Sequence, residues 1–274
     1  MLNTLSTAGG AAGKRLAPRT VQYIRAVLQQ ALNQAVKWEY VARNVAKVVD
    51  APRVEKYVIT PLDQHQAQRL LDAVSGHRLE VLYRLTVSLG LREGEVLGLR
   101  WEDVDFEQRS LRISGALQLQ HGKLKRVATK TASSTRTLPL PPVLLRALQA
   151  HCAAQEKERT LLGDAWQGHQ LVFPSSIGTP MSPRNLVRHF KILLRKAEVA
   201  ETIRFHDLRH SYATLLIAQG VHPRVVMEIL GHSQISVTMN TYAHALPETT
   251  RAAADKVDAL FPSGAAQVSA EPEV

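Results

Sequence analysis

The sequence has 274 residues, of which 45% are hydrophobic and 5% aromatic, and its formal net charge at pH 7 is +10. This length suits one large domain or a medium domain joined to a small one. No apolar run approaches the roughly 18 residues needed to span a bilayer, and the N-terminus lacks a secretory signal pattern, so we expect no membrane association. The single cysteine, Cys152, cannot form an internal disulfide, and a lone thiol suits a cytoplasmic protein.

The positive charge is concentrated in two parts of the sequence. Residues 1–56 hold nine Lys and Arg against three Asp and Glu, and the segment from Arg109 to Arg136 holds seven Lys and Arg with no acid. Concentrated positive charge favours binding to a polyanion such as nucleic acid. Composition alone also allows a basic surface that binds nothing.

The N-terminal part predicts two helices. Residues 1–17 are rich in Gly, Ala, Ser and Thr, and we expect them to be disordered. Pro18 suits a first helical turn, and the apolar residues that follow predict one amphipathic helix that ends near Trp38. A second, short helix is expected from Val41 to Val49. Two helices of this size cannot enclose a core alone, so they must pack on something else or belong to a larger unit.

The rest of the chain predicts a mainly α protein with a small antiparallel β-sheet. Alternating apolar residues between 104 and 140 indicate about three strands, with turns at Gly115 and at His121-Gly122. Thr60 is expected to cap the first helix of this part, and Gly90 to end the second. The helices are expected at residues 61–74, 77–89, 92–99, 142–156, 183–196, 207–219, 223–230, 237–242 and 247–260.

Two polar segments lie beside predicted turns. In Gly-Leu-Arg-Glu-Gly-Glu, Arg92 follows the helix-ending Gly90, and Glu95 lies one helical turn further on. In Thr-Lys-Thr-Ala-Ser-Ser-Thr-Arg, Lys130 is flanked by small hydroxyl residues at a predicted hairpin turn. Each segment alone has an ordinary explanation as exposed charge in a turn.

The segment His-Asp-Leu-Arg-His allows two interpretations. His206 and Arg209 are three residues apart, so they share one face of a helix. His206 and His210 are four apart, a spacing at which paired histidines can also hold zinc. Asp207 departs from the usual zinc motif and the sequence offers no evident third ligand, so we favour a site without metal.

The last polar segment contains a histidine and a tyrosine. His232 follows the helix-ending Gly231, and Tyr242 lies ten residues further on among small and polar residues. A lone tyrosine is usually a core or interface residue.

In chain order, these segments spell Arg…Lys…His-x-x-Arg…His…Tyr, and this order resembles the signature of the tyrosine site-specific recombinases, the phage integrase family. The resemblance extends from about Lys56 to Leu260. It implies a catalytic domain like that of tyrosine recombinases and type IB topoisomerases, mainly α with a small antiparallel β-sheet and preceded by remnant helices of a core-binding domain.

The resemblance also implies a chemical role for each site residue. Two arginines would hold the scissile phosphate, two histidines would assist, a lysine would protonate the leaving 5′-oxygen, and a tyrosine would form a 3′-phosphotyrosyl intermediate without metal, ATP or other cofactor. A glutamate would support the site. The expected catalytic residues are Arg92, Lys130, His206, Arg209, His232 and Tyr242, and the supporting residue is Glu95.

Family members ordinarily carry an N-terminal helical domain that closes over the DNA, and residues 18–55 resemble only its last helices. We therefore expect a chain that is short at its N-terminus. Its expected parts are a disordered segment at 1–17, a partial core-binding region at 18–55, a catalytic domain at 56–261 and a disordered acidic tail at 262–274.

The expected function is site-specific recombination or integration of DNA. The partner would be double-stranded DNA at specific sites, with a homotetramer on DNA, a monomer in free solution, and a cytoplasmic, nucleoid-associated location. Two alternatives stay open: a remnant that binds DNA without completing recombination, and a DNA relaxer like topoisomerase IB.

Overall fold

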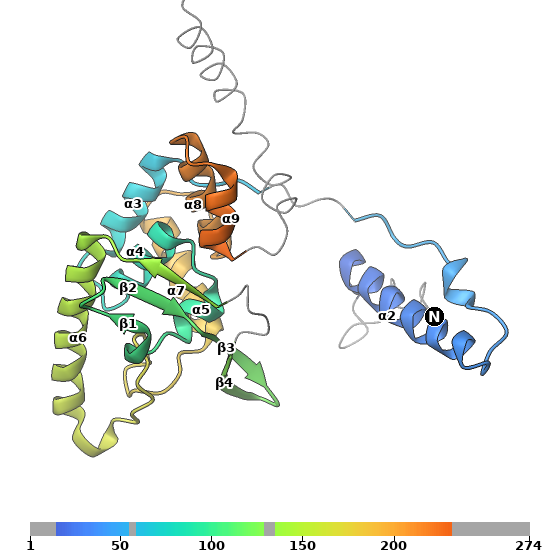
Figure 1. Ribbon diagram of the computed structural model, residues 1–274, viewed down its shortest axis with the longest axis horizontal. Helices are drawn as coiled ribbons and strands as arrows, with labels where there is room; N and C mark the ends of the chain where they lie inside the picture. The colour runs from blue at the N-terminus through green and yellow to red at the C-terminus, as the bar shows by residue number, and fades with distance from the viewer. Residues whose placement is uncertain (1–14, 55–58, 129–134, 232–274) are drawn as a thin grey trace, which may run out of the picture. The chain divides into compact units, whose positions relative to one another are not determined.

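The computed structural model describes residues 15–54, 59–128 and 135–231 (Figure 1). The chain divides into two compact units, Met1–Val58 and Ile59–Val274. In the described residues, no helix is long and apolar enough to cross a membrane.

Among its described residues, the first unit contains the long helix α2 (Pro18–Lys37), with Pro18 in its first turn and Lys37 in its last. This confirms the helix predicted from Pro18 to near Trp38. The helix predicted from Val41 to Val49 is wrong, because the structure has only a single 3-10 turn there, η2 (Val45–Lys47).

Side chains of α2 explain why the following segment is not helical. Arg25 donates to the carbonyl of Val49 at 2.6 Å, and Gln29 donates to the carbonyl of Ala46 at 3.0 Å. A polar backbone needs hydrogen-bond partners, and these carbonyls find theirs on α2. The segment therefore runs along α2 without forming a helix of its own.

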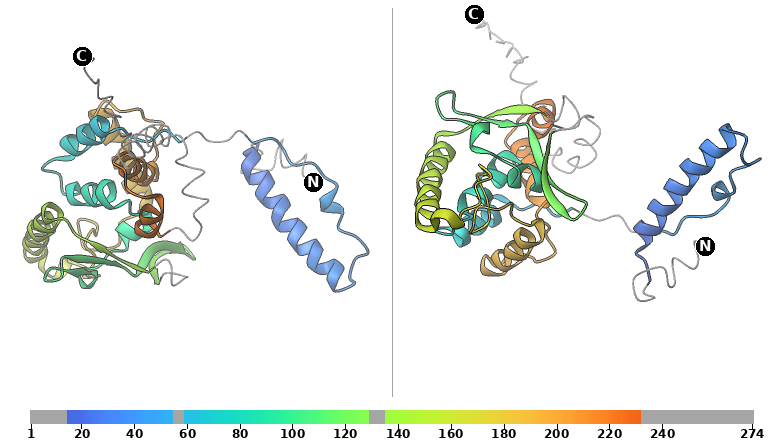
Figure 2. Two further views of the ribbon diagram at one scale, coloured as in Figure 1. Left: turned by 45° about the horizontal axis from the view of Figure 1, so that its top comes forward. Right: turned by 90° about the horizontal axis from the view of Figure 1, so that it is seen from below.

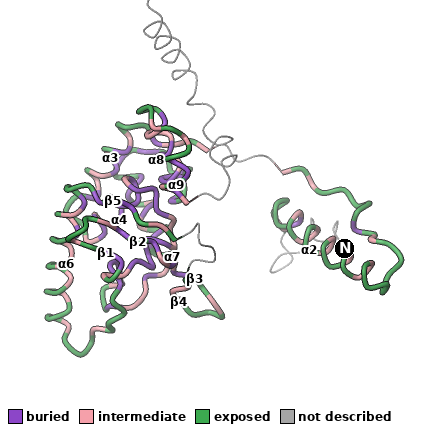
Figure 3. Tube along the Cα trace, in the orientation of Figure 1, coloured by how far each residue is buried: buried purple, intermediate pink, exposed green. Residues whose placement is uncertain are grey.

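In the second unit, helix α4 (Glu80–Leu89) packs against α3 (Gln64–Val74), α6 (Pro142–Leu162) and α8 (Asp207–Ala218). Seven of its ten residues are buried, so its apolar surface is covered on nearly all sides. Figure 3 shows buried residues concentrated in the middle of this unit and exposed residues along the outer face of α6. Gly90 ends α4 in the left-handed conformation at φ 61°, as predicted.

Helix α3 begins later than predicted. Asp63, and not Thr60, caps it: the Asp63 carboxylate accepts from the backbone of Gln66 at 2.7 Å, and the Gln66 side chain accepts from the backbone of Asp63 at 3.1 Å. This reciprocal capping box satisfies two backbone donors at the helix start, which a threonine at residue 60 cannot do alone.

The described strands form two sheets where the sequence predicted one. The first has the order β1 (Val104–Asp105), β2 (Ser110–Ile113), β5 (Arg136–Pro139), and the second pairs β3 (Gly115–Gln120) with β4 (Lys123–Ala128). All pairs are antiparallel. Strands β3 and β4 extend from the body of the unit as a hairpin (Figure 2).

The hairpin confirms one predicted turn and corrects another. His121 and Gly122 both have positive φ, 49° and 76°, which fits a tight two-residue hairpin loop. Gly115 is not a turn but the first residue of β3. A side chain there would come within 3.0 Å of the Arg126 guanidinium and of the Val127 carbonyl oxygen, so glycine permits this close pairing.

The short helix α5 (Glu93–Leu97) packs directly on β3. Gly94 and Gly98 face the strand, and a Cβ atom on Gly98 would lie 2.7 Å from the backbone nitrogen of Leu117. Arg126 of β4 closes the same contact, because it donates to the Gly98 carbonyl at 2.8 Å and pairs with Asp103 at 2.9 Å. Helix α5 and the hairpin are thereby held together.

The C-terminal helices follow the predictions closely. Helices α7 (Pro183–Lys196) and α9 (Pro223–Leu230) have the predicted bounds, and α8 ends one residue early. Helix α6 continues to Leu162, beyond the predicted residue 156. The helices predicted at 237–242 and 247–260 lie outside the described residues. The described residues of this unit also contain two 3-10 turns, η3 (Trp101–Asp103) and η5 (Gly163–Ala165).

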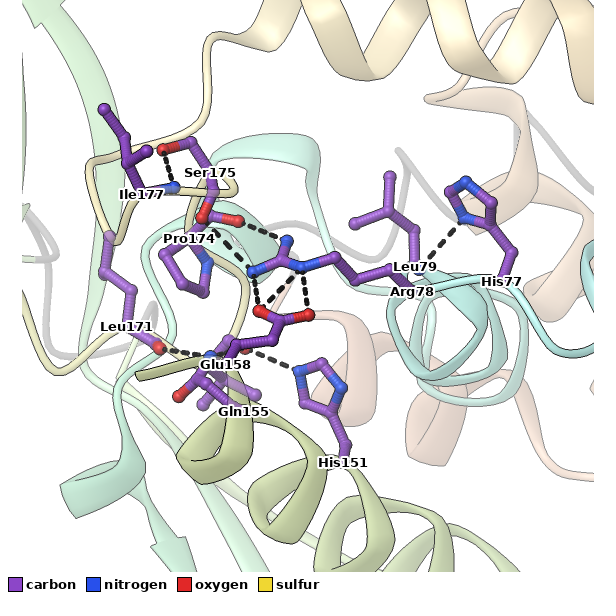
Figure 4. Close-up of polar contacts among 11 residues, drawn as sticks. His77, Arg78, Leu79, His151, Gln155, Glu158, Leu171, Pro174, Ser175 and Ile177 are labelled. Atoms are coloured by element: carbon purple, nitrogen blue, oxygen red, sulfur yellow. Dashed lines mark hydrogen bonds and ion pairs between the residues drawn. The ribbon is translucent and has the colours of Figure 1, made fainter. Parts of the chain in front are cut away.

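A polar network attaches α6 to the segment before α7 (Figure 4). Arg78 makes a bidentate contact with Glu158, at 2.8 Å from Nε and 2.8 Å from Nη2, and also donates to the carbonyls of Pro174 and Ser175. His151 and Gln155 bond to carbonyls of the same segment. The network lies at the N-terminal end of α4, the opposite end from Gly90.

Candidate active site

The site begins at the N-terminus of α5, where Arg92 and Glu95 contact each other. Glu95 accepts from the backbone N–H of Arg92 at 3.0 Å and from its Nη1 at 2.6 Å. The Arg92 side chain is 36% exposed, whereas Glu95 is 4% exposed. A carboxylate in the first turn also compensates the unpaired N–H groups there. Glu95 therefore fixes the direction in which Arg92 leaves the helix.

Arg136, the first residue of β5, binds the same carboxylate from the other side. Its Nη1 and Nη2 lie 3.1 and 2.9 Å from Oε1 and Oε2 of Glu95, and its side chain is only 7% exposed. Burial by itself would raise the pKa of Glu95, but the hydrogen bonds and charge of Arg136, followed by those of Arg92, hold it at about 2. Glu95 is therefore an anion at every physiological pH.

Arg209 lies on α8, inside the domain, with 1% of its surface exposed. It donates to the carbonyl of Gly90 at 2.8 Å, at the C-terminal end of α4, and to the carbonyl of Leu230, the last residue of α9. The carbonyl end of a helix carries partial negative charge, so a guanidinium between two such ends is well placed.

Arg92, Arg136 and Arg209 meet at the end of α9. Arg136 Nε donates to the carbonyl of Ile229 at 2.7 Å, Arg209 to that of Leu230, and Arg92 Nη2 to that of Gly231 at 3.1 Å. Three consecutive carbonyls are thus bound by three arginines from different elements. The end of α9 lies close to α5 in Figures 1 and 2.

His206 and His210 lie at the start of α8, with ring centroids 5.1 Å apart in an edge-to-face arrangement. Burial, followed by the charge of Arg209, lowers the pKa of His206, and the charge of Arg92 acts in the same direction. Burial, followed by His206, lowers the pKa of His210 to about 4. His206 is therefore neutral at pH 7 and can accept a proton.

The zinc interpretation gains no support from the geometry. In the parts of the chain that the structure describes, no three His, Cys, Asp or Glu side chains gather at a distance suited to a metal ion. A zinc site needs three or four such ligands. His206 and His210 instead pack edge to face, and the backbone N–H of Arg209 donates to the carbonyl of His206.

The structure brings four of the predicted residues together: Arg92, Glu95, His206 and Arg209. Lys130, His232 and Tyr242 lie outside the described residues. Sequence reasoning did not assign Arg136 to the site. The available signal was its place in the same polar segment as Lys130, and nothing in that segment indicates that its guanidinium reaches Glu95.

The cluster defines the class of the site. Two guanidiniums hold one buried carboxylate, and a third lies beside them at the end of α9. Together they form a positively charged centre, which suits the oxygens of a phosphate group.

Comparison with known proteins identifies the family. The model of the phage integrase family matches residues 61–249. A XerC-like tyrosine recombinase of Caldanaerobacter subterraneus subsp. tengcongensis is 33% identical over 263 residues, covering 89% of this chain and 66% of that protein. An integrase of Saccharopolyspora erythraea is 28% identical, covering 90% of this chain and 68% of that protein.

This chain belongs to the phage integrase family, the tyrosine site-specific recombinases. The family catalyses cleavage and rejoining of DNA strands, so the predicted family and enzyme class are confirmed. The chain spans about two thirds of the length of the curated relatives it matches.

Solved structures confirm the predicted fold class. The Tn1549 transposon integrase, in complex with transposon right end DNA, matches with a TM-score of 0.74 and 23% identity over 88% of this chain and 80% of that chain. XerA recombinase matches with a TM-score of 0.58 and 19% identity over 89% of this chain and 79% of that chain.

Proposed function

We propose that this chain cuts and rejoins double-stranded DNA at specific sites through a 3′-phosphotyrosyl intermediate on Tyr242. The observation that carries the proposal is the arginine cluster around Glu95, at the end of α9. In sequence this cluster is followed directly by His232 and, ten residues later, by Tyr242.

In this proposal the arginines stabilise charge on the phosphate. Attack on a phosphodiester builds negative charge on its non-bridging oxygens, and preorganised donors stabilise that charge. Arg92 is partly exposed, and its bonds to Glu95 and Gly231 use only some of its five N–H groups. Arg209, held between two helix ends, supplies a second permanent charge, and His232 donates a further hydrogen bond.

The remaining residues move protons. A tyrosine has an ordinary pKa of about 10, so its hydroxyl needs help to lose a proton, and the neutral His206 is the group that accepts or orients it. The Tyr242 oxygen bonds to phosphorus as the bond to the 5′-oxygen breaks, and Lys130 protonates that oxygen. Rejoining is the reverse, with a 5′-hydroxyl as nucleophile. The phosphotyrosine conserves the bond energy, so this route uses no ATP and no metal.

The DNA-facing parts of the chain follow from its charge. Residues 18–55 would contact DNA through exposed basic side chains such as Arg19, Lys37 and Arg43, and residues 56–261 would carry the chemistry. Exchange between two duplexes cuts four strands with one tyrosine each, which fits a tetramer on DNA assembled from free monomers. The chain would act in the cytoplasm, at the nucleoid.

The proposal is tested with a nicked duplex that traps the intermediate. The target is first selected by its retention on the purified chain from a randomised pool of duplexes. We expect the wild-type chain to form a covalent protein–DNA complex in the same yield with and without EDTA. Arg209→Lys should lower that yield at least tenfold, roughly the effect of losing one transition-state contact. The reason is that lysine keeps the charge but cannot donate two forked hydrogen bonds.

Arg195→Lys is the matched control, because Arg195 is 62% exposed and pairs with Glu201 at the surface. Absence of covalent complex with the wild-type chain would contradict the proposal. Loss of complex with EDTA and recovery with zinc would favour the His206 and His210 metal site instead.

A further inference from the structure

Arg136 lies outside the set of residues assigned to the reaction, yet it is the most buried partner of Glu95. Its guanidinium forks onto both carboxylate oxygens, at 3.1 and 2.9 Å. Bidentate arginine–carboxylate pairs are stronger and more directional than single contacts. Because Arg92 binds Oε1 of the same carboxylate at 2.6 Å, the position of Arg136 is transmitted to Arg92.

Arg136 also reaches the end of α9, where its Nε donates to the carbonyl of Ile229 at 2.7 Å. Helix α9 has no basic residue in its own last turn. The negative end of this helix is therefore compensated by arginines from other elements, and Arg136 contributes from β5. The next residue after this end is Gly231, which binds Arg92 at 3.1 Å, and the chain then continues into His232.

We propose that Arg136 is a positioning residue for the cleavage reaction: it holds Glu95 so that Arg92 is correctly aimed, and it holds the end of α9 beside Arg92 and Arg209. This inference rests on the proposed function above. Arg136 does not touch the phosphate; it acts through Glu95 and through the backbone of α9.

The charges around Glu95 give this role a pH signature. The groups that act on it are Arg136 from β5 and Arg92 from the start of α5, and Arg136 is the larger influence. From α8 and α9 the neighbouring groups are Arg209 and the carbonyls of residues 229–231. Arg136→Lys keeps a positive charge but loses the forked hydrogen bonds, which oppose the effect of burial most strongly, so the pKa of Glu95 rises. A protonated Glu95 then loses its charge-assisted hold on Arg92 at mildly acidic pH.

The test compares Arg136→Lys with Arg78→Lys. Arg78 is a matched control, because it too makes a bidentate contact with one glutamate, Glu158, and donates to backbone carbonyls, but at the opposite end of α4 (Figure 4). The rate of covalent complex formation on the selected nicked duplex is measured at saturating DNA from about pH 8 to about pH 5, a range above the ordinary pKa of Glu. Each rate is divided by the folded fraction from circular dichroism.

For Arg136→Lys we expect a rate roughly ten- to a hundredfold below wild type, the effect of a small misplacement of a reacting group, with little change in DNA affinity. The ratio of variant to wild-type rate should fall further as the pH is lowered. The ratio of the Glu95→Gln rate to the wild-type rate should not change with pH, because glutamine at position 95 cannot titrate. Arg78→Lys should keep the wild-type rate per folded molecule.

Two results would overturn the inference. A wild-type chain that forms no covalent complex contradicts the proposed function, and the role of Arg136 falls with it. A wild-type chain that does form the complex, with Arg136→Lys equally fast at every pH, contradicts the role of Arg136 alone.

Discussion

Replacing Glu95 by glutamine removes a negative charge from a buried position between two guanidiniums. The side chain is 4% exposed, and Arg136, its bidentate partner, is 7% exposed. Glutamine keeps the shape and one acceptor oxygen, but leaves the Arg136 charge buried without an anion. A buried charge without its partner is costly, so we expect a large loss of stability.

The magnitude follows from the pKa of Glu95. A pKa held at about 2 against an ordinary value of 4.5 corresponds to roughly 3 kcal/mol of stabilisation by the charged form. Loss of one member of a buried pair costs a similar amount, about 3–5 kcal/mol. We therefore expect Glu95→Gln to lower the free energy of unfolding by roughly 3 kcal/mol at pH 7.

Urea unfolding of the full chain, followed by tryptophan fluorescence, measures this loss. Trp101 and Trp166 lie in the same unit as Glu95. With a slope of about 2 kcal/mol per molar urea, the midpoint should fall by roughly 1.5 M. Glu102→Gln is the control, because Glu102 is 57% exposed and pairs with Arg100 at the surface; it should cost less than about 1 kcal/mol.

The pH dependence checks the cause. Because the folded-state pKa of Glu95 is lowered, its stabilisation is fully present above about pH 4.5 and is lost as the pH falls toward about 2. The difference between wild type and Glu95→Gln should therefore be constant from pH 7 to pH 5 and shrink below that. A loss under about 1 kcal/mol at pH 7, or a difference that grows in acid, would refute the reasoning.

Two other predictions concern the hairpin and the segment that follows it. Gly98→Ala places a Cβ 2.7 Å from the Leu117 nitrogen, and in the same urea assay it should destabilise the unit by about 1–3 kcal/mol. Gly168→Ala is the control and should be neutral, because no atom lies nearer than 3.9 Å to the added Cβ. Equal effects of the two substitutions would contradict the close packing of α5 on β3. Lys130→Ala should slow cleavage of a normal phosphodiester much more than of one with a 5′-bridging sulfur, since a thiolate leaves without a proton; equal loss on both substrates would make Lys130 a phosphate contact only.

The sequence predicted best those elements whose ends carry local signals. Helix α9 begins at Pro223 and ends before Gly231, which has φ 64°, and both bounds match the prediction. The turn at His121 and Gly122 is likewise determined by residues that accept positive φ. Such signals depend on the backbone preferences of a few adjacent residues.

The errors occurred where distant parts of the chain decide the structure. The segment from Val41 to Val49 was predicted as a helix, but Arg25 and Gln29 of another helix bind its carbonyls. The second sheet was missed because alternation indicates strands without showing which strands pair. These outcomes depend on contacts that no local pattern contains.

The candidate site was predictable in its residue types but not in its connections. Arg92, Glu95 and Arg209 stand out by their order in the sequence, and the structure places them in one cluster. Arg136 was missed because its contact with Glu95 spans 41 positions and arises only when β5 pairs with β2 and brings it to α5.

The most direct test of the account is to identify the residue that becomes linked to DNA. After the wild-type chain reacts with the selected nicked duplex, protease digestion and mass spectrometry of the adduct should find the nucleotide on Tyr242, joined through a 3′-phosphate. Tyr242→Phe should form no adduct, while Tyr40→Phe, a change at a 77% exposed tyrosine, should form it at the wild-type level. An adduct on another residue, or undiminished adduct in Tyr242→Phe, would contradict the account.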